Sequence, residues 1–135
     1  LRDIMPTLLD IAGAEIPVSV DGQSLLPLTE DPDLEQRTWL HGEHSYGEFS
    51  NHWIVTKTAK YIWHSQSGAE QYFDLASDPH ELTDLIDDPA RQDRISELRL
   101  LLIKSLKDRP EGFTDGVRLI KNRPYPPSLP SATMP

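Results

Sequence analysis

Cysteine is absent from this sequence of 135 residues. Its absence excludes a disulfide framework, a thiolate metal site and a cysteine nucleophile within these residues. Oxidising and reducing compartments both tolerate chains without cysteine, so composition leaves the localisation unknown. Periplasmic, extracellular and cytoplasmic locations all stay open.

Long apolar runs and an excess of basic residues are also missing. No stretch reaches the roughly 18 apolar residues that read as a membrane-spanning helix. The chain has 13 Lys and Arg against 22 Asp and Glu, which gives a net charge of −9. Nucleic acids and anionic membrane surfaces attract basic proteins, so we expect neither as a partner. The sequence also lacks a glycine-rich phosphate loop and a Gly-x-Ser-x-Gly elbow.

The composition that remains is that of a folded chain with a modest core. Hydrophobic residues make up 37% and charged residues 26% of the sequence, and the length suits one domain. The first residue, Leu1, already lies in an apolar pattern, without an initiator Met or a signal peptide. We therefore expect the chain to be a piece of a longer protein.

Two short aromatic segments near the middle of the chain predict a β-hairpin. Residues 60–64 and 70–75 carry tyrosine, tryptophan and phenylalanine at positions that suit a half-buried sheet, and residues 65–69 form a polar, glycine-bearing connection. Residues 37–45 and 52–57 predict two earlier strands. Short polar connections favour antiparallel neighbours, so a four-stranded antiparallel sheet is expected.

A long helix should follow the sheet. Asp88 suits the capping position and Pro89 the first helical position, and the helix is predicted to end at about Lys107. Its main apolar stripe should pack across one face of the sheet, which makes the fold class α+β. Leu100 and Ile103 point away from the stripe and predict a second covering surface. The stripe consists of Ile95, Leu98, Leu102 and Leu106.

The first part of the chain predicts a second, shorter helix. Asp3 is expected to cap a helix over residues 4–12, and Gly13 should end it in the left-handed conformation. Its apolar face would lack a partner within this chain. Ser24 is expected to cap a single helical turn that Pro27 ends.

The segment from Lys60 to Leu85 reads KYIWHSQSGAEQYFDLASDPHELTDL. It closely resembles the signature of the C-terminal subdomain of sulfatases, in which KYIW, G-x-EQLFDL and DP-x-E recur. Residues 3–13 and 17–28 are similar to two earlier sulfatase segments. Asp84 stands where the family usually carries Asn, a difference that bears on one loop hydrogen bond.

The resemblance implies a domain organisation and a fold. Residues 1–36 would be the last helix and the crossover from a large catalytic domain that this chain does not contain. Residues 37–109 would be the sheet and helix of the small C-terminal subdomain of alkaline-phosphatase-like sulfatases. The prolines between residues 124 and 135 exclude regular structure and make residues 110–135 an irregular, proline-rich tail. We expect this tail to wrap the domain through Phe113, Leu119, Ile120 and Tyr125 and to be disordered beyond about Ser128.

The resemblance also implies a chemistry. A full-length sulfatase hydrolyses sulfate esters with a formylglycine, made from the Cys or Ser of a Cys/Ser-x-Pro-x-Arg motif, and with a calcium ion. No residue of this chain matches that motif or those metal ligands, so we assign no catalytic residue and no metal ligand here. The chain should complete the fold and the rim of the cleft and be inactive alone. Its partners would be the N-terminal catalytic domain and a small-molecule or carbohydrate sulfate ester.

One cluster carries residue types suited to acid–base or metal chemistry, His41-Gly42-Glu43-His44. On a strand, His41 and Glu43 share one face and His44 lies on the other. A metal site on both histidines would need helical spacing, which Gly42 disfavours. Sulfatases show a similar string on a strand that reaches towards the cleft. His41, Glu43 and His44 are therefore candidate substrate contacts, with plain polarity at a strand end as the alternative.

The remaining histidines and acidic residues do not form a further candidate site. His52, His64 and His80 are expected at the surface or a strand edge, and the acidic residues 84–88 lack the spacing of a calcium loop.

Two alternative functions stay open. One is that the chain is the C-terminal part of a phosphonate or phosphate ester hydrolase of the same superfamily. The other is a free-standing acidic interaction module.

Overall fold

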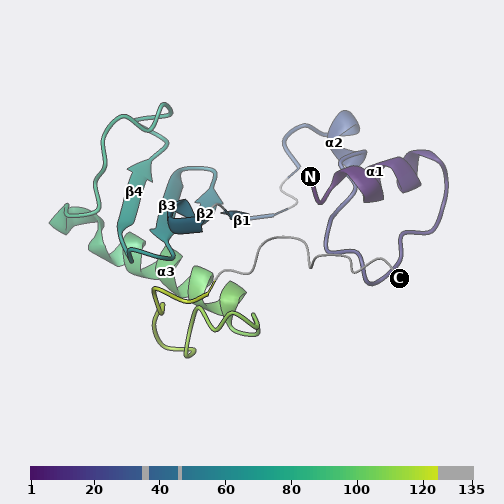
Figure 1. Ribbon diagram of the computed structural model, residues 1–135. Helices are drawn as coiled ribbons and strands as arrows, with labels where there is room; N and C mark the ends of the chain where they lie inside the picture. Colours follow the sequence, from purple (N-terminus) through teal and green to yellow (C-terminus); the bar gives the residue numbers. More distant parts are fainter. Residues whose placement is uncertain (35–36, 46, 125–135) are drawn as a thin grey trace, which may run out of the picture. The chain divides into compact units, whose positions relative to one another are not determined.

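The computed structural model describes residues 1–34, 37–45 and 47–124. The chain divides into two compact units, Leu1–Thr38 and Trp39–Pro135, whose elements are labelled in Figure 1. Within the described residues, no helix has the length and apolar character to cross a membrane.

The second unit contains the four-stranded antiparallel sheet that the sequence predicts. Its strands are β1 (Trp39–His44), β2 (Asn51–Thr56), β3 (Ala59–His64) and β4 (Glu70–Asp74), and they neighbour one another in chain order. A short 3₁₀ turn, η1 (Gly47–Phe49), lies between β1 and β2. The β2–β3 connection is tight without an Asn-Gly pair because the Thr56 hydroxyl accepts a hydrogen bond from the Ala59 N–H at 3.0 Å.

The core lies on one face of this sheet. Burial alternates along β3, so Ala59, Tyr61 and Trp63 point into the core. Ile54 of β2 lies beside Tyr61 in the antiparallel register and is also fully buried. This alternation is what one buried face of a pleated sheet requires.

The helix α3 (Gln92–Leu106) lies against the sheet (Figure 1), as predicted. Its start differs from the prediction, because residues Pro89–Arg91 form the 3₁₀ turn η2 and the α-helix begins only at Gln92. The expected cap is present, since the Asp88 carboxylate accepts a hydrogen bond from the Ala90 N–H at 2.9 Å. The predicted stripe of Ile95, Leu98, Leu102 and Leu106 is fully buried.

The prediction of a second covering surface on α3 is right for Ile103 and wrong for Leu100. Ile103 is only 5% exposed, whereas Leu100 is 61% exposed. The segment after α3 packs on the core through Phe113, which is fully buried, and the Asn122 N–H donates to the Ser65 carbonyl at 2.9 Å. The predictions for Tyr125 and for the chain beyond Ser128 lie outside the described residues.

The first unit contains α1 (Ile4–Ile11) and the short α2 (Pro27–Glu30). Gly13 follows α1 with a φ of +67°, the left-handed conformation that the sequence predicts. The predicted turn before Pro27 is right in part. The Ser24 hydroxyl accepts a hydrogen bond from the Leu26 N–H at 3.2 Å, as expected of a cap, but Pro27 begins α2 instead of ending a helix. Proline suits a first helical position, where its missing N–H breaks no intrahelical bond.

The predicted Asp3 cap is also wrong. The Asp3 carboxylate makes no capping bond to α1. Instead its oxygens accept from the two terminal nitrogens of Arg37 at 2.7 and 2.9 Å, and one of them accepts from the Gln23 N–H at 2.9 Å. The Arg37 guanidinium, as the largest cause, lowers the pKa of Asp3. A charged, two-pronged partner outcompetes a neutral backbone donor for the same oxygens.

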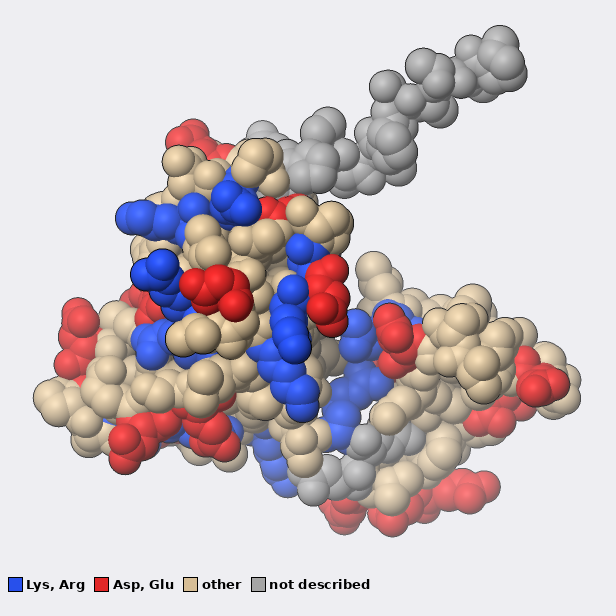
Figure 2. All heavy atoms as spheres, turned by 90° about the horizontal axis from the view of Figure 1, so that it is seen from below, with Lys and Arg blue, Asp and Glu red and all other residues tan. Residues whose placement is uncertain are grey.

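Figure 2 shows Lys and Arg side chains interspersed with Asp and Glu on the face that it draws.

Candidate functional site

The strand β1 is an edge strand and carries the cluster that the sequence singles out. In the antiparallel register His41 lies opposite Ile54, and Glu43 lies opposite His52. His41 and Glu43 therefore share the core face of the sheet. His44 lies on the opposite face and is exposed, which confirms the predicted alternation.

The structure brings His52 into contact with both residues. The distance from His41 Nε2 to His52 Nδ1 is 3.3 Å, and that from Glu43 Oε2 to His52 Nδ1 is 3.4 Å. One ligand atom from each of the three residues lies within 4.8 Å of the others. We call this group the His41–Glu43–His52 cluster.

The prediction that His52 lies at the surface or a strand edge is wrong, because its side chain is fully buried. Its ring stacks on Trp63 with centroids 5.9 Å apart and meets Phe113 edge-on at 4.9 Å. A sequence signal existed, since His52 and Ile54 are two residues apart and so share a face of β2. The covering residue, Phe113, lies far along the chain and has no periodic signal of its own.

Burial sets the protonation state of His52. It lowers the pKa of the imidazole to about 4, with smaller lowering contributions from His41 and Arg109 and a raising contribution from Glu111. The ring is therefore neutral at pH 7, and a neutral imidazole carries one N–H and one nitrogen lone pair.

Arg109, just beyond α3, links the cluster to Glu111. Its guanidinium lies 3.1 Å from Glu43 Oε2 and binds both carboxylate oxygens of Glu111, at 2.8 and 3.2 Å. The hydrogen bond from Arg109 lowers the pKa of Glu111. One guanidinium thus faces two carboxylates, so these three charged groups together carry one net negative charge.

Packing explains why a glycine, Gly42, lies between His41 and Glu43. A Cβ on Gly42 would lie 2.3 Å from the indole ring of Trp53, which covers this position on the other face of the sheet. Any larger residue would displace that ring. The other two histidines behave as expected: His80 is exposed, and His64 lies at a strand end, 3.1 Å from Gln71 Oε1.

The sulfatase-like signature proves to be a set of structural contacts. Lys60 Nζ binds both carboxylate oxygens of Glu81, at 2.7 and 2.9 Å. Asp84 Oδ1 accepts from the backbone N–H groups of Tyr72 and Ile86, each at 3.0 Å. The loop hydrogen bond left in question by the Asn-to-Asp difference is therefore made, because a carboxylate oxygen accepts as well as an amide oxygen does.

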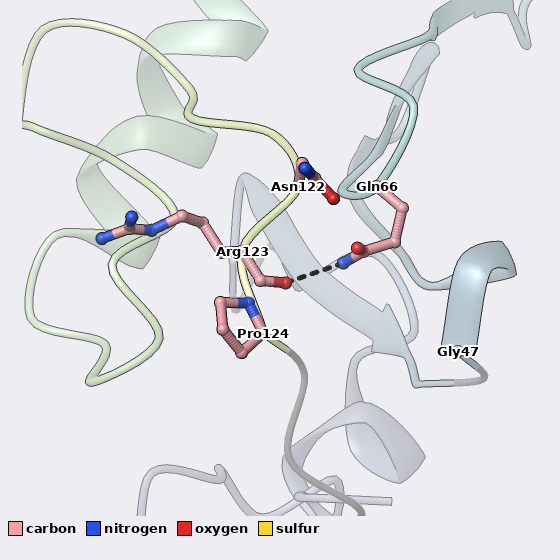
Figure 3. A pocket seen from close by; sticks show the side chains of 5 residues that line it. All are labelled: Gly47, Gln66, Asn122, Arg123 and Pro124. Carbon is pink, nitrogen blue, oxygen red and sulfur yellow. Dashed lines mark hydrogen bonds between the residues drawn. The ribbon is translucent and has the colours of Figure 1, made fainter.

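A pocket of about 290 Å³ lies at the end of the sheet (Figure 3). Gln66 Nε2 donates to the Arg123 carbonyl across it at 3.0 Å. The Arg123 side chain points away from Gln66 and donates to the Glu111 carbonyl at 3.3 Å. The pocket therefore presents amides and backbone more than charge. Its lining residues are Gly47, Gln66, Asn122, Arg123 and Pro124.

The residues of this chain do not fit a formylglycine centre. The chain has no cysteine. Ser77 and Ser128 each precede a proline at the motif spacing, but Glu81 and Ala132 stand where the motif requires Arg. Glu81 is moreover bound by Lys60. No catalytic step is assigned to these residues.

The sheet, the helix and the signature loop together define the small α+β subdomain of alkaline-phosphatase-like sulfatases. Residues 2–108 match the family described as N-sulphoglucosamine sulphohydrolase, C-terminal, and the chain belongs to this family. An arylsulfatase of Clostridium perfringens (strain 13 / Type A) is 56% identical over 124 residues, which cover 92% of this chain and 26% of the relative.

Solved structures show the same fold. A structure described as a 2-O GAG sulfatase superimposes with a TM-score of 0.69 at 26% identity, over 82% of this chain and 25% of that one. A phosphonate monoester hydrolase from Silicibacter pomeroyi gives a TM-score of 0.64 at 21% identity, over 78% of this chain and 24% of that one. The latter likeness shows the fold alone. The chain spans about a quarter of the arylsulfatase's length.

Proposed function

We propose that this chain is the C-terminal part of an arylsulfatase-type enzyme that hydrolyses sulfate esters. The observation that carries the proposal is the 56% identity to an arylsulfatase over 92% of the chain. The formylglycine and the calcium ion belong to residues outside this chain in the proposed enzyme. There, calcium would supply Lewis-acid polarisation of the sulfate.

The proposed role of the chain is to complete the fold and the rim of the substrate cleft. Residues 1–36 would connect to the catalytic domain, residues 37–109 form the small subdomain, and residues 110–135 form the tail. An apolar face supports the connection: Ile4 and Met5 are each 52% exposed, and Leu8 and Ile11 are 61% and 62% exposed. Such a contiguous exposed face typically marks an interface.

We further propose that the β1 strand reaches the cleft rim, with His41, Glu43 and His44 as its candidate substrate contacts. Glu43 is 39% exposed and His44 is exposed, so both are within reach of a partner or ligand. Such contacts bind the group attached to the sulfate in the ground state and the transition state alike.

Steady-state kinetics of the full-length enzyme test this rim role. His41→Ala, Glu43→Gln and His44→Ala should raise KM for a bulky carbohydrate sulfate more than they lower kcat, because the lost contact is equal in both states. A small aryl sulfate, which does not extend to the strand, should be affected less. Equal, small effects on both substrates would mean that His41, Glu43 and His44 do not contact the substrate and are ordinary polar residues at a strand end.

The second candidate is hydrolysis of a phosphonate or phosphate ester. The fold shared with a phosphonate monoester hydrolase supports it. The deciding experiment compares kcat/KM of the full-length protein for an aryl sulfate and for the matching phenyl phosphonate. A higher value for the sulfate supports the sulfatase, and the reverse ratio supports the alternative. The free-standing module has no comparable support, since the family match covers residues 2–108.

A further inference from the structure

We propose that His41, Glu43 and His52 form a binding site for a divalent transition-metal ion of the zinc type. This site is separate from the calcium implied for a sulfatase. It rests on the geometry, the donor atoms and the surrounding charges of the cluster, and it holds whether or not the proposed function does.

Two of the three separations between ligand atoms suit a tetrahedral ion. Zinc binds histidine nitrogen and carboxylate oxygen at about 2.0–2.2 Å, so two ligands of one tetrahedron lie about 3.3–3.5 Å apart. The two measured separations from His52 Nδ1 are 3.3 Å to His41 Nε2 and 3.4 Å to Glu43 Oε2. Both exceed the usual range for protein hydrogen bonds, about 2.7–3.2 Å. Both separations therefore match those between two ligands of one tetrahedral ion.

The types of ligand atom in the cluster also favour one kind of ion. Two imidazoles and one carboxylate are ligands that zinc accepts, with a fourth position for water or another group. Calcium prefers six to eight oxygen ligands, and the cluster offers too few of them. The chemistry of the cluster therefore favours a zinc-type ion over calcium.

The surrounding charges permit a cation despite the nearby Arg109. The guanidinium lies 3.1 Å from Glu43 Oε2 but also binds both oxygens of Glu111. Set against the single charge of Arg109, Glu43 and Glu111 leave one net negative charge around the site. Arg109 also orients Glu43, as outer hydrogen-bond partners do for metal-binding carboxylates.

The site would join two neighbouring strands, and a segment distant in sequence covers it. His41 and Glu43 belong to the edge strand β1, and His52 belongs to β2. Phe113 and Arg109, which follow α3, cover His52 and contact Glu43. A bound ion would therefore fasten the exposed edge of the sheet to its neighbour and stabilise the folded state.

The test is a titration of the tag-free chain with Co²⁺, Zn²⁺ and Ca²⁺, monitored by visible absorption and thermal unfolding. Tetrahedral Co²⁺ should give an intense visible band that saturates at one equivalent and that Zn²⁺ abolishes. Zn²⁺ should raise Tm and Ca²⁺ should not. His41→Ala and Glu43→Gln, neither of which alters a fully buried side chain, should each weaken the affinity at least about 10-fold.

His44→Ala is the matched control, because His44 lies on the same strand but on the opposite face. It should bind Co²⁺ like the unchanged chain. Absence of the visible band, or equal affinities in the unchanged chain, His41→Ala and Glu43→Gln, would overturn the proposal. Sulfatase activity does not enter this test, so its outcome is independent of the proposed function.

Discussion

Burial of the His52 imidazole couples the folding of the sheet to pH. Its pKa is about 4 in the folded chain, against an ordinary value of 6.5. The unfolded chain therefore binds more protons between these two values, and the free energy of unfolding should rise with pH across this window. The contribution is complete above pH 6.5 and is lost as pH falls towards 4, for a total of about 3 kcal/mol.

Urea unfolding at several pH values between 4.5 and 7, with a chelator present, measures this loss. Asp3 and Glu111 add losses only below their ordinary pKa values of 3.8 and 4.5, because theirs are lowered further. The His52→Gln variant should lose most of the slope between pH 5 and 6.5. A slope that persists in this variant would assign the pH dependence to another group.

Asp84 provides a second prediction at the scale of one residue. Its Oδ1 accepts two backbone hydrogen bonds that fix the loop after β4. Asp84→Ala should lower the free energy of unfolding by about 1–3 kcal/mol, because two donors lose their partner. Asp84→Asn keeps the acceptor and should unfold at nearly the unchanged urea midpoint. If both variants were equally destabilised, the charge rather than the acceptor would matter.

At the scale of elements, α3 is the main partner of the sheet. Leu102 is fully buried, so Leu102→Ala should cost about 2–5 kcal/mol in the free energy of unfolding. Leu100→Ala is the matched control on the same helix, since Leu100 is 61% exposed, and it should change the urea midpoint little. A larger effect at Leu100 than at Leu102 would mean that the other face of α3 carries the core.

The sheet and α3 were predictable because their patterns are local. Aromatic residues alternate along β3, and the apolar residues of α3 recur with helical spacing, so period alone identifies both elements. The prediction for Asp3 fails because two partners compete for one carboxylate. The Asp3 carboxylate accepts hydrogen bonds from Arg37 rather than from the backbone at the start of α1. No pattern in the neighbouring sequence predicts that pairing.

The His41–Glu43–His52 cluster was predictable only in part, because it depends on contacts between residues that are not adjacent in sequence. Strand alternation places His41 and Glu43 together. The register with β2 and the cover by Phe113 then decide that His52 joins them. Arg109 and Glu111 reach the cluster from an irregular segment after α3, where no periodicity guides a prediction.

At the scale of the whole molecule, the contacts of the signature segment explain why it identifies a family without revealing its chemistry. Lys60 with Glu81, and Asp84 with two backbone groups, hold a loop onto the sheet. These contacts are equally useful beside a sulfate-binding or a phosphonate-binding cleft. Solved structures described as a sulfatase and as a phosphonate monoester hydrolase share the fold of this chain.

We propose that this chain is part of a sulfate ester hydrolase whose reactive groups lie outside it. Turnover of an aryl sulfate, measured with the purified full-length protein and with the 135-residue chain under the same conditions, tests this proposal. We expect turnover by the full-length protein and none by the chain. Turnover by the chain alone, or a full-length protein that cleaves phosphonate esters but no sulfate ester, would contradict it.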